Sequence, residues 1–67
     1  MKEYRYTDNN GNVIQFLPLD GTFDDKGNQL YQQVIGSVII NNKWTKAEIL
    51  LLMDNGYKWT TKELPSL

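Results

Sequence analysis

The sequence contains no cysteine and no histidine, and these two absences exclude several kinds of chemistry. Without cysteine the chain can form neither a disulfide nor a thiolate nucleophile. Without histidine it lacks the usual general base at neutral pH and the most common metal-ligating side chain. A glycine-rich phosphate-binding loop is missing as well. We therefore expect no enzyme activity, no catalytic residue, no metal site and no cofactor.

Long apolar runs and an excess of charge of one sign are also missing. The longest apolar run is five residues, far below the about 20 residues that a membrane-spanning helix needs. The first ten residues do not contain the apolar segment of a secretory signal. Seven basic and eight acidic residues give a net charge of −1. We expect a cytoplasmic protein without membrane contact, for which nucleic acid is an unlikely partner.

What the sequence does contain is the composition of a small folded domain. Hydrophobic residues make up 40% and charged residues 22% of the 67 residues, which is typical of an ordered chain too short for two cores. We expect one domain over residues 1–67 with an α+β fold. A small antiparallel sheet of three or four strands, formed by an N-terminal β-hairpin and one or two further strands, should pack against a single helix at about residues 46–55.

The N-terminal residues predict a β-hairpin, because an Asn-Gly turn separates two β-prone segments. A two-residue loop at Asn10 and Gly11 would mix apolar and polar side chains on both faces of the hairpin. A three-residue loop at 9–11 would separate them. It places Tyr4 opposite Phe16, Tyr6 opposite Ile14 and Arg5 opposite Gln15. Since a slip of one residue moves every side chain to the other face, the longer loop is favoured.

The middle of the chain gives weaker signals and no internal repeat. Residues 17–29, with two glycines, a proline and three aspartates, read as a connecting loop with a tight turn at 26–28. The aspartates do not follow the D-x-D-x-D-G order of a calcium loop, so we interpret them as solvated. Residues 30–40 have the apolar spacing of a helix but the β-branched content of a strand. We favour a strand at about 33–40, and the helix remains open.

The helix at 46–55 is predicted from its two ends. Thr45 and Glu48 form an S/T-x-x-E capping box, and Gly56 stands where a left-handed residue commonly ends a helix. The residues after it, 57–61, read as a short last strand.

The segment VIINNKWTKAEILLLMDNGYKW resembles a unit of strand, turn, capped helix and glycine, with a polar turn at 41–43. Similar units form the short repeats at the C-terminal end of some type I DNA topoisomerases and occur in many small phage proteins. The resemblance rests on positions that any capped helix after a strand requires, so it implies no particular family.

Residues 44–64 are also similar to the first helix and glycine turn of helix-turn-helix DNA binders. In those proteins a recognition helix follows and enters the major groove. Pro65 interrupts the chain where this helix should continue, so we do not expect DNA recognition by this route.

The predicted helix carries more apolar residues than one core can cover. One side of it holds Ile49, Leu50 and Met53. Leu51 or Leu52 is then left on the outer side. Either the loop at 20–33 folds over this side, or another chain covers it.

Three function hypotheses follow from these features. The leading one is a small non-enzymatic protein-interaction module of phage or mobile-element type, which docks on a host protein and inhibits or modulates it. Its partner-binding residues are expected to be Trp44, Leu51, Leu52, Tyr57 and Trp59. The first alternative is a nucleic-acid or nucleotide binder, in which the tryptophans stack on bases and lysines hold phosphates. Those lysines are Lys43, Lys46, Lys58 and Lys62. The second alternative is a structural homo-oligomer that uses the same leucines symmetrically.

Overall fold

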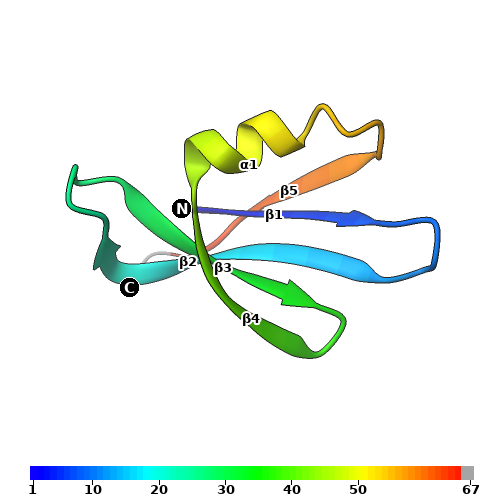
Figure 1. The fold of residues 1–67 in the computed structure, drawn as a ribbon, viewed down its shortest axis with the longest axis horizontal. Coiled ribbons are helices and arrows are strands. Elements are labelled where there is room, and N and C mark those ends of the chain that lie inside the picture. Colours follow the sequence, from blue (N-terminus) through cyan, green and yellow to red (C-terminus); the bar gives the residue numbers. More distant parts are fainter. Residues whose placement is uncertain (66–67) are drawn as a thin grey trace.

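The computed structural model describes residues 1–65, which form an antiparallel sheet of five strands and one short helix (Figure 1). In chain order the elements are β1 (Lys2–Thr7), β2 (Val13–Phe23), β3 (Gln29–Ile35), β4 (Val38–Thr45), α1 (Lys46–Leu52) and β5 (Trp59–Glu63). The strands lie in the order β4-β3-β2-β1-β5, so that β1 pairs with both β2 and the last strand. The predicted α+β fold class is confirmed, with five strands instead of three or four.

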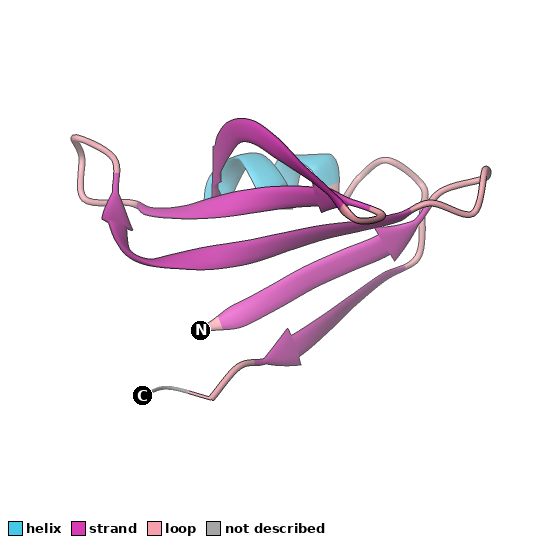
Figure 2. Cartoon of the chain, turned by 90° about the horizontal axis from the view of Figure 1, so that it is seen from below, coloured by secondary structure: helices cyan, strands magenta, loops and turns pink. Residues whose placement is uncertain are grey.

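The core lies between α1 and one face of the sheet, the only face that α1 covers (Figure 2). Tyr4 lies opposite Phe16 and Tyr6 opposite Ile14, which confirms the register predicted from the three-residue loop. Because side chains alternate along a strand, this register places all four on the covered face. Phe16 and Ile49 are fully buried there, and Tyr31 nearly so. We call the other side of the sheet the open face.

Two of the hairpin turns are built in the same way, a short repeat that the sequence analysis missed. Residues 8–12 read DNNGN and residues 24–28 read DDKGN. In each turn the aspartate carboxylate accepts hydrogen bonds from the backbone N–H groups of the third and fifth residues, at 2.8 to 2.9 Å. The glycine has a positive φ, 81° in the first turn and 84° in the second. The expected turn at 26–28 is therefore confirmed.

The loop predicted around that turn is too long, because residues 17–23 continue β2. β1 pairs with β2 only as far as Phe16, so the rest of β2 has β3 as its one neighbour. A strand with a free side can include Pro18, which lacks a backbone N–H. The pairing with β3 becomes irregular after this residue. There the side-chain amide of Gln29 donates to two backbone carbonyls of β2, at 2.5 and 3.2 Å.

The preference for strand over helix at 33–40 is confirmed, but the single continuous strand expected there is wrong. The chain reverses at Gly36 and Ser37, where Gly36 has a φ of 61°, and forms the hairpin of β3 and β4. The polar residues 41–43, expected as a turn, lie within β4, where a shift in the pairing with β3 accommodates them. The segment therefore contributes two strands, which accounts for the larger sheet.

The start of α1 is as predicted. The Thr45 hydroxyl accepts a hydrogen bond from the Glu48 backbone N–H at 3.3 Å. In return, the Glu48 carboxylate accepts one from the Thr45 backbone N–H at 2.9 Å. These reciprocal bonds form the capping box that fixes the first turn.

The helix ends earlier than predicted, at Leu52 instead of residue 55. Asn55 uses its side-chain oxygen to accept from the Tyr57 backbone N–H and from the Trp59 indole N–H, both at 3.1 Å. Such local side-chain bonds compete with helical hydrogen bonds. Gly56 has the expected positive φ, 87°, but lies in the loop beyond the helix. The expected last strand is present and runs two residues later than predicted.

Candidate interaction surfaces

The three aromatic residues predicted to contact a partner pack against the core. The Trp44 ring meets Phe16 edge-on, with the ring centroids 5.0 Å apart. Trp59 lies 5.9 Å from Phe16 and 4.3 Å from Tyr6, and Tyr57 stacks on Tyr6 at 5.1 Å. All three predicted residues are half-buried. Large offset or edge-to-face aromatic pairs of this kind stabilise a fold, so core packing accounts for much of their surface.

Two tyrosines of the covered face, Tyr6 and Tyr31, have raised pKa values. Burial raises the pKa of Tyr6, and the charges of Tyr57 and Asp8 raise it further. Burial also raises the pKa of Tyr31, with a smaller contribution from Tyr4. Both shifts therefore have burial against the core as their main cause.

The orientation of α1 decides which of its leucines face the core and which face outward. Leu52 packs against the core beside Ile49 and Met53. Leu51 is 77% exposed and Leu50 is 51% exposed. The expectation that Leu50 faces the core is wrong, because the inward side of the helix is formed by residues 49, 52 and 53. The outer side consequently carries two adjacent leucines.

The lysines of the nucleic-acid alternative do not surround the tryptophans. Because side chains alternate along a strand, Lys43 and Lys62 lie on the face opposite Trp44 and Trp59. Lys62 lies opposite Glu3 in the pairing of β5 with β1, on the open face. The four candidate lysines are all exposed: Lys43, Lys46, Lys58 and Lys62. Two of them are thus separated by the sheet from the rings on which bases would stack.

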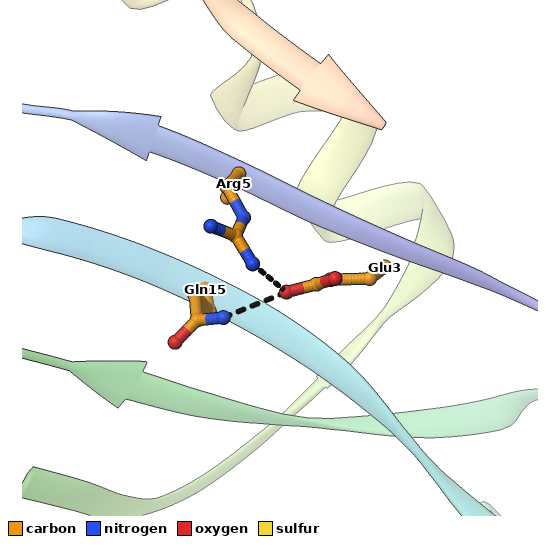
Figure 3. A network of polar contacts seen from close by, with 3 residues as sticks. All are labelled: Glu3, Arg5 and Gln15. Carbon is orange, nitrogen blue, oxygen red and sulfur yellow. Dashed lines mark hydrogen bonds and ion pairs between the residues drawn. The ribbon is translucent and has the colours of Figure 1, made fainter. Parts of the chain in front are cut away.

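A polar network lies on the open face and joins β1 to β2 (Figure 3). One Glu3 carboxylate oxygen accepts hydrogen bonds from the Arg5 guanidinium at 2.7 Å and from the Gln15 side-chain amide at 2.6 Å. Burial raises the pKa of Glu3, but these bonds and the charges of Arg5 and Lys62 outweigh it and leave the pKa lowered. Glu3 is therefore a fixed carboxylate that holds two strands together, an arrangement unsuited to proton transfer.

Of the three aspartates at 20, 24 and 25, Asp24 forms hydrogen bonds within its own turn. Hydrogen bonds from the Asn28 side chain and backbone lower the pKa of Asp24, and the Lys26 backbone N–H adds to the effect. Asp20 and Asp25 are exposed.

Over residues 1–65, no three acidic side chains come close enough to hold a metal ion, and no pocket is formed. The same residues contain no helix with the length and apolar character needed to cross a membrane.

A second group of exposed apolar residues, which was not predicted from the sequence, lies at the edge of the sheet. Val38 is 60% exposed and Ile39 is 59% exposed. Both lie in β4, which pairs with β3 alone among the strands of residues 1–65. A signal for this strand is present, because Gly-Ser between two pairs of aliphatic residues is typical of a β-hairpin. A reversal there makes the second pair part of an outer strand.

Neither a protein-family model nor a curated protein or solved structure matches this chain. From the exposed aliphatic residues, the two candidate surfaces are the outer side of α1 and the free edge of β4. Both expose aliphatic side chains.

Proposed function

We propose that this chain is a small protein-interaction module that binds a partner protein through the outer side of α1. The observation that carries the proposal is the exposure of Leu51, 77%, directly beside Leu50 at 51%. One exposed leucine is ordinary on a protein surface. Here two of them and the exposed Ala47 form the outer side of a helix of only seven residues. The apolar surface is thus a strip and not an isolated side chain.

No other segment of the described chain covers this strip. The segment at 20–33, which was expected as a loop able to fold over the helix, belongs to β2, β3 and the turn between them. Moving one leucine side chain from water to a fully buried site provides about 1.5–3 kcal/mol. Leu50 and Leu51 together can therefore supply a useful part of a binding free energy without any change in the fold.

We extend the proposal to the kind of activity. A module that occupies the surface of another protein needs no catalytic group, which agrees with a sequence that has neither histidine nor cysteine. Inhibition or modulation of a host protein, as by a phage or mobile-element protein, is the activity that fits such a module. Its small size, 67 residues, suits binding to one site on a larger protein.

The proposal is tested by affinity capture with three tagged proteins: the wild type, Leu51→Glu and Thr60→Glu. The second variant adds the same charge at an exposed position of β5 and serves as the control. We expect at least one protein from a cell lysate to bind the wild type and the control. Its recovery with Leu51→Glu should fall about tenfold or more, which corresponds to about 1.4 kcal/mol of binding free energy.

Sedimentation equilibrium over a wide concentration range accompanies the capture experiment. A wild-type mass that is independent of concentration agrees with a module that binds a different protein. Equal recovery of every bound protein by all three baits would contradict the proposal. So would self-association that Leu51→Glu abolishes, because the strip would then be the contact of a homo-oligomer.

A further inference from the structure

The two outer strands of the sheet differ in what they expose. β5 forms one edge, and its exposed residues are Thr60, Thr61, Lys62 and Glu63. Charged side chains on an edge strand oppose pairing with another chain. β4 forms the other edge and exposes Val38 and Ile39, at 60% and 59%. One edge is thus protected against strand pairing, while the other presents an aliphatic strand.

The first part of β4 offers a short regular stretch to a further strand. Residues 38–40 pair without interruption with β3. The register then shifts, so that Asn41 and Asn42 separate this stretch from Lys43. A bulge of this kind ends regular pairing at an edge. An added strand is therefore short and reaches the neighbourhood of Lys43 just beyond the regular stretch.

The charges near this stretch favour a partner of one sign. Within residues 36–47 the only charged side chains are Lys43 and Lys46. Neither takes part in an ion pair within the part of the chain that the structure describes. A carboxylate on an added strand would meet positive charge here, and such complementarity selects between partners.

From this geometry we infer that the free edge of β4 accepts one extended segment of a partner protein, added antiparallel to residues 38–40. Because successive residues of a strand alternate, side chains of the segment pack beside Val38 on one face of the sheet and beside Ile39 on the other. A carboxylate on its N-terminal side lies near Lys43. Main-chain hydrogen bonds give such strand addition its affinity, and the side chains give it specificity. This contact lies apart from the leucines of α1 and does not depend on the proposed function of that helix.

A second copy of the chain fits this edge less well. Two β4 strands paired about a two-fold axis would share only residues 38–40 of each copy. The pairing would also bring lysine and no carboxylate from β4 to the edge. A partner segment with its own acidic residue can both pair with residues 38–40 and place a carboxylate near Lys43.

An NMR titration of the full chain with a synthetic peptide tests the inference. The probe is a peptide with blocked ends and the sequence Glu-Glu-Thr-Val-Thr-Val-Thr. In antiparallel pairing its glutamates lie near residue 43, its two valines lie opposite residues 38 and 40, and the threonine between them lies opposite Ile39. We expect saturable shifts of the amides at 38–43, with a Kd of about 1 mM or tighter. A peptide with lysines in place of the glutamates should bind several-fold more weakly.

Three variants locate the binding. Ile39→Lys places a charge in the middle of the free stretch and should abolish binding of the glutamate peptide. Thr61→Lys places the same charge on β5 and should leave it unchanged. Lys43→Glu should reverse the preference between the two peptides, and this result does not depend on whether Ile39→Lys folds.

Leu51→Glu should leave the affinity for the peptide unchanged, which separates this inference from the function proposed for α1. Three results would overturn the inference. They are the absence of saturable shifts at 38–43, shifts centred on β5, and a preference between the peptides that Lys43→Glu does not alter.

Discussion

The two faces of the sheet are stabilised in different ways. On the face that α1 covers, aromatic and aliphatic side chains bury one another, and Phe16 and Ile49 have no exposed surface. On the open face, Glu3 is 4% exposed although no helix lies over it. Long side chains of its own sheet, Arg5 and Gln15 among them, provide its cover. The open face also carries aliphatic residues that stay half-buried, which are Val13, Leu17 and Val34.

This difference shows how a short chain distributes its apolar residues. One well-covered face provides most of the stability, and the open face contributes strand-to-strand contacts that remain close to water. The two sides of α1 differ in the same way, because Ile49 is buried on the inner side and Leu51 is exposed on the outer side. Apolar residues that the core does not use then remain at the outer side of α1 and at the edge of β4.

The largest effect should come from the covered face. Phe16→Ala should cost about 3–5 kcal/mol of unfolding free energy, the usual range for truncating a buried aromatic residue. A core in a chain of this length rarely supplies more than about 3–5 kcal/mol, so the variant should be largely unfolded at 25 °C. Leu17→Ala changes the next residue, on the open face, and should cost only about 1 kcal/mol. Urea unfolding followed by tryptophan fluorescence measures both, and equal losses would contradict the comparison.

The open face should give a smaller effect that depends on pH. Glu3→Gln removes the charge that accepts from Arg5, whose side chain is 44% exposed. Solvent screening at this exposure limits the expected loss to about 1 kcal/mol near neutral pH. Because the folded pKa of Glu3 is lowered, its contribution is complete above the ordinary carboxyl value of 4.5 and is lost as the pH falls through the folded pKa.

The difference in unfolding free energy between wild type and Glu3→Gln should therefore shrink in acid. The turn residues Asp8 and Asp24 also have lowered pKa values, so both proteins still lose stability at low pH. Urea midpoints measured at neutral pH and at about pH 3 decide the matter. A difference that stays constant over this range would show that the Glu3 charge is not the stabilising feature of the network.

The parts of the fold that could be predicted from sequence are those determined by neighbouring residues. The pairing of Tyr4 with Phe16 follows from two-residue periodicity on either side of an Asn-Gly turn. The start of α1 follows from Thr45 and Glu48, which satisfy each other's backbone groups. In both cases the determining groups lie within a few residues of one another.

The errors arose where distant segments decide the structure. Pro18 indicated a loop, yet it lies in β2 because β1 no longer pairs there. The polar residues at 41–43 indicated a turn, yet the shifted register with β3 keeps them in a strand. Propensity describes a residue alone, whereas each of these positions depends on which strand lies beside it.

The candidate site was predictable only in part for the same reason. Leu51 was among the residues expected to be free, and its exposure identifies the outer side of α1. Helical periodicity could not decide between Leu51 and Leu52, because the rotation of the helix depends on its packing against the core, where Leu52 and Met53 lie. Trp44 and Trp59 looked like contact residues, but Phe16 provides the surface on which they pack.

The smallest effect on stability should come from the outer side of α1, and it is the most direct test of the central claim that the fold does not use these leucines. The free energy of unfolding of Leu51→Glu in urea should lie within about 0.5 kcal/mol of the wild type, as for a surface substitution. Leu52→Glu, one position further, should be strongly destabilised because it places a charge against the core. A loss of more than about 2 kcal/mol for Leu51→Glu would contradict the account, since it would show that the chain covers Leu51 itself.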